Sequence, residues 1–266
     1  MPRVFLRLAY RGTAYHGWQT QAPGLPTVQT AVEEALARML GYRGHVHGCG
    51  RTDAGVHAAD YYAHFVLREG APLYYDPVAR LNRVLPPDIS VRGWHPVLAK
   101  AHAQRDATWR AYRYRIATRK SPFDEGLAGR YHDSLLDVSA MRDVAAAYAK
   151  TRHDLPDGTQ DFRAFCRRPD QYPHTRCRVD TCTLAAPNDG LLHFDIRANR
   201  FLHHQVRLLV ARMLDVGAGR LSLADIQRAL ATGESPQRRR PAAPEGLYLT
   251  GVGYPPDIWL AQPPST

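Results

Sequence analysis

The residues best suited to chemistry lie between Gly48 and Ala58, in the stretch GCGRTDAGVHA. Three glycines within eight residues allow this segment to turn sharply, to adopt positive φ and to approach a ligand closely. Asp53 lies among these glycines, and Arg51 is two positions before it. A carboxylate held in such a turn could act as a nucleophile or a base. The structural alternative is a tight turn in which Asp53 accepts hydrogen bonds from neighbouring backbone N–H groups.

The formal charge of the chain favours a polyanionic partner. Its 266 residues include 35 lysines and arginines against 25 aspartates and glutamates, which gives a formal net charge of +10. This excess predicts binding to nucleic acid first and to an anionic membrane surface second. One basic segment, RRRP at residues 238–241, is interpreted either as a solvated turn or as an RNA contact.

Neither the cysteines nor the apolar segments suggest an exported or membrane-bound protein. The cysteines form no C-x-x-C pair and no disulfide-framework spacing, so we expect reduced thiols at Cys49, Cys166, Cys177 and Cys182. The chain starts directly in a strand-like pattern, without a charged and then apolar signal region. No apolar run approaches the roughly 20 residues of a membrane span. We therefore expect a soluble, cytoplasmic protein.

The elements around Asp53 are predicted to follow the order βαββαβ, which is the ferredoxin-like arrangement. Thr27 is the expected N-cap of a helix with apolar residues at helical spacing, and Gly41 is its expected stop. Asp76 is the expected N-cap of a short second helix, with Pro77 at its first position. The expected strands lie near residues 4–9, 44–49, 59–67 and 89–95.

The second half follows the same order loosely, without a detectable sequence repeat. Its expected strands lie near residues 108–117, 178–184, 191–199 and 247–254, and its expected helices follow Asp137, run from 201 to 216 and run from 223 to 231. Residues 120–131 and 154–175 show no clear pattern. We therefore expect an α/β (α+β) fold of two ferredoxin-like, RRM-like halves, with mainly antiparallel sheets that meet at a central cleft. The expected domains are residues 1–103, which carry the Asp53 loop, and residues 104–266.

Five stretches, in order along the chain, resemble one family. They are YRGTAYHGWQ at residues 10–19, GRTDAGVHA at 50–58, YRYR at 112–115, FLHHQVR at 201–207 and EGLYL at 245–249. Together they resemble the tRNA pseudouridine synthases of the A type, a family that modifies uridines in the anticodon stem-loop. The resemblance implies conversion of uridine to pseudouridine at tRNA positions 38–40. It also implies a two-domain α/β fold, a homodimer, tRNA as partner and no cofactor.

The same resemblance implies roles for individual residues. Asp53 falls on the essential aspartate of the family, and Tyr112 falls on the tyrosine that packs against the target base. Arg207 falls on the arginine that pairs with the aspartate, and Arg51 matches a basic residue that helps to displace the base. The chain departs from the family pattern at four positions, since Arg11, Gln205, Leu208 and Ala211 stand where Asp, Met, Asn and Gly are common.

The implied reaction suits the residues present. Pseudouridine formation breaks the bond from N1 to the sugar and reattaches the base through C5, so no group is donated and nothing is oxidised. One carboxylate can serve if it is ionised, and an adjacent arginine favours the ionised form. The base must leave its stack at a cost of about a few kcal/mol, and the face of Tyr112 can offset part of this. The sequence leaves open whether Asp53 attacks the sugar, attacks the base or removes a sugar proton.

Two other classes of function were weighed. A non-catalytic RNA-binding protein of two ferredoxin-like units would be expected to carry an RNP-like stretch, and none is present. A metal-dependent hydrolase would need a set of ligands with metal spacing. His203 and His204 are adjacent and so point to different faces of a helix, and we predict no metal site.

Overall fold

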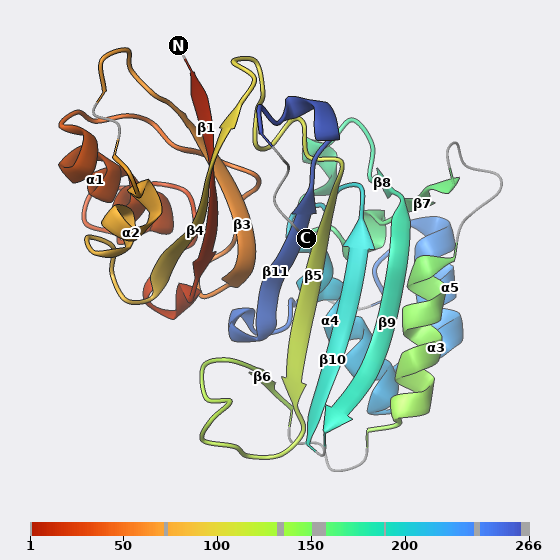
Figure 1. Cartoon of the computed structure of the whole chain (residues 1–266). Helices are drawn as coiled ribbons and strands as arrows, with labels where there is room; N and C mark the ends of the chain where they lie inside the picture. Colours follow the sequence, from red (N-terminus) through yellow and green to blue (C-terminus); the bar gives the residue numbers. More distant parts are fainter. Residues whose placement is uncertain are drawn as a thin grey trace. The chain divides into compact units, whose positions relative to one another are not determined.

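The computed structural model describes residues 2–71, 74–131, 136–150, 158–188, 190–236 and 240–261. By their internal contacts these residues form two compact units, drawn in Figure 1. The first unit runs to Thr108 and resumes at Tyr248, and the second unit is Trp109–Leu247. Each unit is described by itself below.

The first unit contains the predicted βαββαβ order. Its elements are β1 (Arg3–Tyr10), α1 (Val28–Leu40), β2 (His47–Gly48), β3 (His57–Val66), α2 (Pro77–Asn82) and β4 (Ile89–Val97). Strand β1 pairs antiparallel with β3 on one side and with β4 on the other. The last strand, β11 (Leu247–Gly253), pairs parallel with β3 through Tyr248 and Leu249. The helices begin as predicted, because the side chains of Thr27 and Asp76 accept hydrogen bonds from the backbone three residues later.

The second unit contains a mainly antiparallel sheet with packed helices and a separate two-stranded sheet. Its strands are β5 (Trp109–Ala117), β6 (Gly129–Arg130), β7 (Gln160–Asp161), β8 (Arg176–Cys177), β9 (Val179–Asn188) and β10 (Leu191–Ala198). Its helices are α3 (Val138–Ala149), α4 (Gln205–Gly217) and α5 (Leu223–Thr232). Strand β10 lies between β5 and β9, and α3 packs against β9, α4 and α5. Short 3₁₀ turns occur in this unit at Arg163–Phe165, Pro169–Gln171 and Pro244–Gly246, and in the first unit at Gly12–Ala14 and Pro256–Ile258.

The prediction of an α+β fold with mainly antiparallel pairing is confirmed, whereas several element boundaries differ. Strand β2 is only two residues long, because the backbone N–H of Val46 is bound by the Glu33 carboxylate of α1 instead of a neighbouring strand. Helix α4 begins at Gln205 rather than 201. The segment 120–131, expected to lack structure, contributes β6. The part of 154–175 that is described contributes β7 and two 3₁₀ turns.

The C-terminal segment differs from the predicted division at residues 103 and 104. That division assigned everything after residue 103 to the second domain, whereas the segment from Tyr248 has its contacts in the first unit. The reason is long-range pairing, since β11 adds to β3 and the Tyr248 ring stacks on His57 with centroids 4.6 Å apart. The division into two domains and the central cleft stay predictions.

Two further expectations concern the environment of the protein. Within the described residues, no helix combines the length and the apolar character that a bilayer crossing requires. All four cysteines are free and buried. The cysteines therefore contribute to the cores as small apolar side chains.

A cluster of histidines in the first unit contains His47, His64 and His102. His64 of β3 is buried, its ring stacks on His47 with centroids 4.9 Å apart, and His102 lies edge-on at 4.5 Å. The backbone N–H of Ala103 donates to Nδ1 of His64 at 3.1 Å. Burial, reinforced by the charges of His102, Arg3, His47 and Arg105, lowers the pKa of His64 to about 3.

Because the pKa of His64 is lowered in the folded protein, we predict that the protein loses stability in mild acid. An unfolded histidine has a pKa near ~6.5, so below that pH the unfolded state binds a proton that folded His64 rejects. The free energy of unfolding should then fall by up to about 1.4 kcal/mol per pH unit between the two pKa values. Urea unfolding at about pH 7 and pH 5 measures this, with His64→Gln as comparison because its amide oxygen can still accept from Ala103. An equal loss in both proteins would contradict the assignment to His64.

Candidate active site

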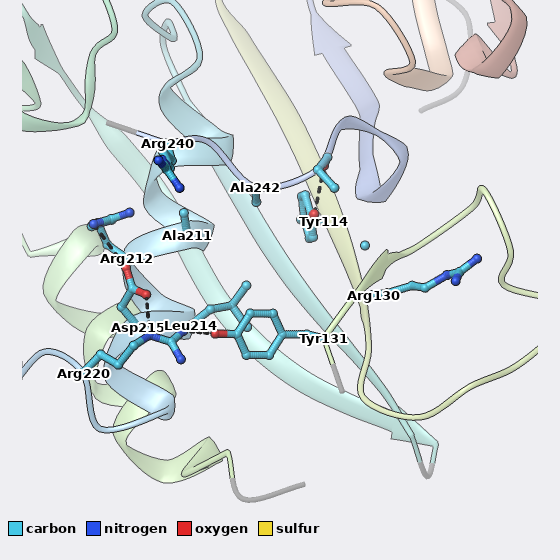
Figure 2. A pocket seen from close by; sticks show the side chains of 12 residues that line it. Tyr114, Arg130, Tyr131, Ala211, Arg212, Leu214, Asp215, Arg220, Arg240 and Ala242 are labelled. Atoms are coloured by element: carbon cyan, nitrogen blue, oxygen red, sulfur yellow. Dashed lines mark hydrogen bonds and ion pairs between the residues drawn. The ribbon is translucent and has the colours of Figure 1, made fainter. Parts of the chain in front are cut away.

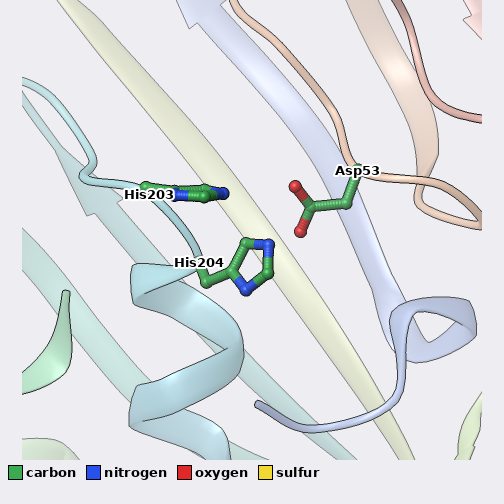
Figure 3. A group of neighbouring side chains, drawn as sticks. All are labelled: Asp53, His203 and His204. Atoms are coloured by element: carbon green, nitrogen blue, oxygen red, sulfur yellow. The ribbon is translucent and has the colours of Figure 1, made fainter. Parts of the chain in front are cut away.

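The Asp53 loop joins β2 to β3 and is fixed by its own backbone. The carbonyl of Asp53 accepts a hydrogen bond from the N–H of Val56 at 3.2 Å, which closes a tight turn. Of the three glycines in the loop, only Gly55 has positive φ, at 79°. Thr52 is buried, Asp53 is half-buried and Arg51 is exposed. The Asp53 side chain extends away from the loop backbone (Figure 3).

The loop after β1 is bound to the Asp53 loop by three hydrogen bonds. The N–H of Trp18 donates to the carbonyl of Thr52 at 3.2 Å, and the N–H of Gly55 donates to the carbonyl of Tyr15 at 3.2 Å. The N–H of Gly12 donates to Nδ1 of the buried His57 at 3.1 Å. The two backbones approach so closely that a Cβ on Gly12 would lie 2.0 Å from the carbonyl oxygen of Val56. These contacts join two of the stretches that resemble the family, YRGTAYHGWQ at residues 10–19 and GRTDAGVHA at 50–58.

Three aromatic rings form the base beneath the loop. Tyr10, Trp18 and Tyr61 are buried, with the Trp18 and Tyr61 centroids 4.2 Å apart. The hydroxyl of Tyr61 donates to the carbonyl of Gly50 at 2.5 Å, and the hydroxyls of Tyr10 and Thr52 are hydrogen-bonded at 2.8 Å. The backbone is thus anchored just before Arg51 and just before Asp53. Sequence reasoning missed Tyr10 and Tyr61 as supports of this loop, because strand alternation reveals burial but not the partner of a hydroxyl group.

Tyr112 lies on β5 in the second unit, opposite Ile196 of β10. It is half-buried, and its ring meets Phe201 edge-on with centroids 4.9 Å apart. Tyr114, two residues later, is buried and donates its hydroxyl to the carbonyl of Ala243 at 2.9 Å. Tyr114 is therefore part of the core, and of these two tyrosines only Tyr112 has a partly accessible ring.

Arg207 lies in the first turns of α4. Its Nε donates to the carbonyl of Ala242 at 2.7 Å, and the N–H of Ala242 donates back to the carbonyl of Arg207 at 3.0 Å. This exchange ties α4 to the segment before β11. The side chain is therefore anchored rather than loosely solvated, and its pairing with Asp53 stays a prediction.

The turn into α4 contains His204, the only described non-glycine residue with positive φ, at 60°. Histidine tolerates this left-handed region better than most residues, although the conformation is uncommon. His203 and His204 meet edge-on with ring centroids 4.2 Å apart (Figure 3). Gln205 follows, fully buried, and its Oε1 accepts from the N–H of Leu202 at 2.7 Å and from the Cys177 thiol at 3.7 Å. Gln205 stands where the family commonly has Met, and its side chain stabilises this turn through these hydrogen bonds.

The other departures are placed as follows. Leu208 is buried in the core beside α4, and Ala211 lines a cavity described below. Arg11 is exposed, and its backbone N–H donates to the carbonyl of Asp88 at 2.9 Å. None of these three side chains disturbs the hydrogen bonds that hold the Asp53 loop.

Comparison with known proteins decides the family. Residues 155–255 match the family model described as tRNA pseudouridine synthase. A protein of Porphyromonas gingivalis named tRNA pseudouridine synthase A is 37% identical over 262 residues, which cover 98% of this chain and 100% of the relative. The chain belongs to the tRNA pseudouridine synthase A family.

Further relatives carry the same name. The tRNA pseudouridine synthase A of Bacteroides fragilis is 38% identical over 97% of this chain and 98% of its own length. That of Chromobacterium violaceum is 40% identical over 97% of this chain and 95% of its own length. The resemblance inferred from five short stretches is therefore confirmed along nearly the whole chain. The matched region 155–255 includes Arg207, and the similarity to the relatives extends over the first unit with its Asp53 loop.

Proposed function

We propose that this member of the tRNA pseudouridine synthase A family isomerises uridine to pseudouridine in the anticodon stem-loop of tRNA, at positions 38–40. The observation that carries the proposal is the similarity of 37–40% to synthases of that name over nearly the full chain. The formal charge of +10 agrees with a polyanionic substrate.

The proposed chemistry needs one carboxylate and one aromatic ring. Asp53 acts as nucleophile or base, and Arg207 keeps that carboxylate ionised. The bond from N1 to C1′ breaks, the base turns, a bond from C5 to C1′ forms, and the proton leaves C5 while N1 gains one. Tyr112 packs against the displaced base, and Arg51 helps to displace it. The anchoring of the Asp53 loop by Tyr10 and Tyr61 supports this proposal, because a catalytic group that is already held in position lowers the activation barrier of the reaction.

The test is to incubate the protein with an unmodified tRNA transcript and to map pseudouridine by position. We expect pseudouridine at positions 38–40, with no added cofactor and no effect of a chelator. Pseudouridine elsewhere only would overturn the proposed position, and tRNA binding without any pseudouridine would favour the non-catalytic alternative. Loss of activity with a chelator would favour a metal-dependent mechanism.

Tyr112 is expected to contribute through its hydroxyl group as well as its ring. If the hydroxyl moves the proton from C5, Tyr112→Phe should slow pseudouridine formation by about 10²–10⁴-fold, while Tyr112→Ala should also lose about 1–3 kcal/mol of stacking. Single-turnover rates measure this, and Tyr75→Phe is a control because Tyr75 is fully exposed. A Tyr112→Phe rate within about threefold of wild type would leave the ring face as the whole contribution.

The protein is also proposed to act as a homodimer, as the family resemblance implies. Sedimentation at micromolar concentration should give twice the chain mass of 29.8 kDa. A single species at the mass of one chain would count against a dimer.

A further inference from the structure

The second unit contains a cavity of ≈ 610 Å³ between β5, β6, α4 and the segment before β11 (Figure 2). Its volume falls in the range of about 300–1,000 Å³ that small-molecule sites occupy. Small residues on several sides leave this space open, namely Ala211, Ala242 and Ala243. None of the residues assigned above to the chemistry lines it.

The charged residues of the lining are mainly arginines. Among the described residues, the lining has four arginines and one aspartate, which are Arg130, Arg212, Arg220, Arg240 and Asp215. Asp215 is shared by two of them, with Arg212 Nη1 3.2 Å from Oδ2 and Arg220 Nε 3.0 Å from Oδ1. One carboxylate between two guanidiniums leaves this group with a positive charge. Arg212 and Asp215 are both buried and offset each other's charge, so the surplus positive charge lies on Arg220, whose side chain is 46% exposed.

The remaining arginines differ in their partners. Arg130 is paired with Glu125, which offsets its charge. Arg240 is exposed and adds a further positive charge to the lining. The basic segment singled out in the sequence thus contributes Arg240 to the cavity, while Arg238 and Arg239 lie outside the described residues. Four arginines less Asp215 and Glu125 give a charge of +2.

Tyr131 gives the cavity an aromatic wall. Tyr131 is hydrogen-bonded through its hydroxyl to Arg220, whose guanidinium lies 5.8 Å from the ring centroid. Tyr114 also lines the cavity, but it is buried and its hydroxyl donates to the carbonyl of Ala243. Guanidinium groups bind phosphate oxygens in a planar, bidentate way, and aromatic rings stack on bases.

We propose that this cavity binds a phosphate-bearing nucleotide of the tRNA strand other than the uridine that reacts. The proposal rests on the proposed function in that tRNA is the substrate. The ligand class follows from the lining, because a charge of +2 suits the phosphates that flank one nucleotide and the ring of Tyr131 suits its base. The cavity therefore adds affinity for tRNA without taking part in bond exchange.

Two substitutions test the cavity in different ways. Arg240→Gln removes a charge from the lining without altering α4, and Ala211→Leu fills the space with a side chain that a helix accepts. Each has a matched control. Arg228→Gln removes a charge from α5, where the side chain is 70% exposed and does not line the cavity, and Ala211→Gly keeps the space open.

The measurement is the Kd for an unmodified tRNA transcript over a range of salt concentrations. Losing a charged hydrogen bond should raise Kd about tenfold for Arg240→Gln, and the log–log salt slope should fall by about 1. Ala211→Leu should raise Kd by a similar factor, whereas the two controls should stay close to wild type. Unchanged Kd for both Arg240→Gln and Ala211→Leu would overturn the proposal.

A second readout separates this inference from the proposed function. Ala211 lies one helical turn after Arg207, so the single-turnover rate at saturating tRNA reports any disturbance of that arginine. We expect both cavity variants to keep the wild-type rate at saturation. If Ala211→Leu slows the reaction, its Kd is set aside, and the Kd of Arg240→Gln alone tests whether the cavity binds tRNA. Absence of pseudouridine in the wild-type protein would defeat the proposed function, whereas the Kd comparison would still decide the cavity.

Discussion

Asp53→Asn is expected to abolish pseudouridine formation while leaving the fold intact. The turn at this position is closed by the backbone carbonyl of Asp53, so an amide of the same shape preserves it. The amide can neither act as a nucleophile nor accept the proton, and loss of such a group costs at least about 10²–10⁴-fold. Affinity for tRNA should stay equal or rise slightly, because one negative charge near a polyanion is removed. Single-turnover assays and equilibrium binding measure the two effects.

The control for this substitution is Asp76→Asn. Asp76 is the N-cap of α2, and asparagine caps helices about as well as aspartate. This variant should therefore keep both stability and rate. Turnover of Asp53→Asn above about a hundredth of wild type would rule out Asp53 as the group that performs the chemistry.

Gly12→Ala is expected to have the second largest effect, although Gly12 lies 41 residues before Asp53 in the sequence. A Cβ there would meet the carbonyl oxygen of Val56 at 2.0 Å, so the two backbones must separate. Overpacking of this kind costs about 1–3 kcal/mol of stability, and a shift of about 1 Å at a reacting group can cost about 10²-fold in rate. The free energy of unfolding in urea and the single-turnover rate should both fall.

Gly50→Ala is the matched control for that substitution. Gly50 belongs to the Asp53 loop itself, has ordinary φ, and a Cβ there would meet nothing within 4 Å. Its rate should therefore stay near wild type, even though it is closer to Asp53 in sequence than Gly12. Equal rates for the two alanine variants would show that the close approach at Gly12 does not position the carboxylate.

Local signals in the sequence predicted the elements that local interactions form. Helix α1 starts after Thr27 and stops at Gly41 as expected, because a capping hydroxyl and a left-handed glycine act within one turn. The order of the first unit followed from alternation and helical spacing in the same way. The candidate site residues were found through the family resemblance. Without it, an aspartate in a glycine-rich loop is explained equally well as a residue that accepts backbone hydrogen bonds in a tight turn.

The features that were missed depend on distant parts of the chain. No local pattern indicates that the hydroxyl of Tyr10 binds Thr52 or that β11 pairs with β3. The late start of α4 was also missed, because the run from Phe201 is helical in spacing but His204 adopts a left-handed conformation. Gln205 looked like a departure from a pattern, and only the structure reveals the hydrogen bonds that it makes to Leu202 and Cys177.

The return of the chain end to the first unit has a consequence for synthesis on the ribosome. Strand β3 begins at His57, directly after the Asp53 loop, and its parallel neighbour β11 begins at Leu247. A nascent chain that has exposed the whole Asp53 loop must still wait for about 190 further residues before β3 gains this neighbour, roughly ten seconds or more at a synthesis rate of about 5–20 residues per second. The first unit is therefore the first to emerge and the last to be completed. A chain released before Tyr248 leaves the backbone of His57 and Ala58 without its pairing partner, so a truncated product is expected to be degraded rather than to bind tRNA unproductively.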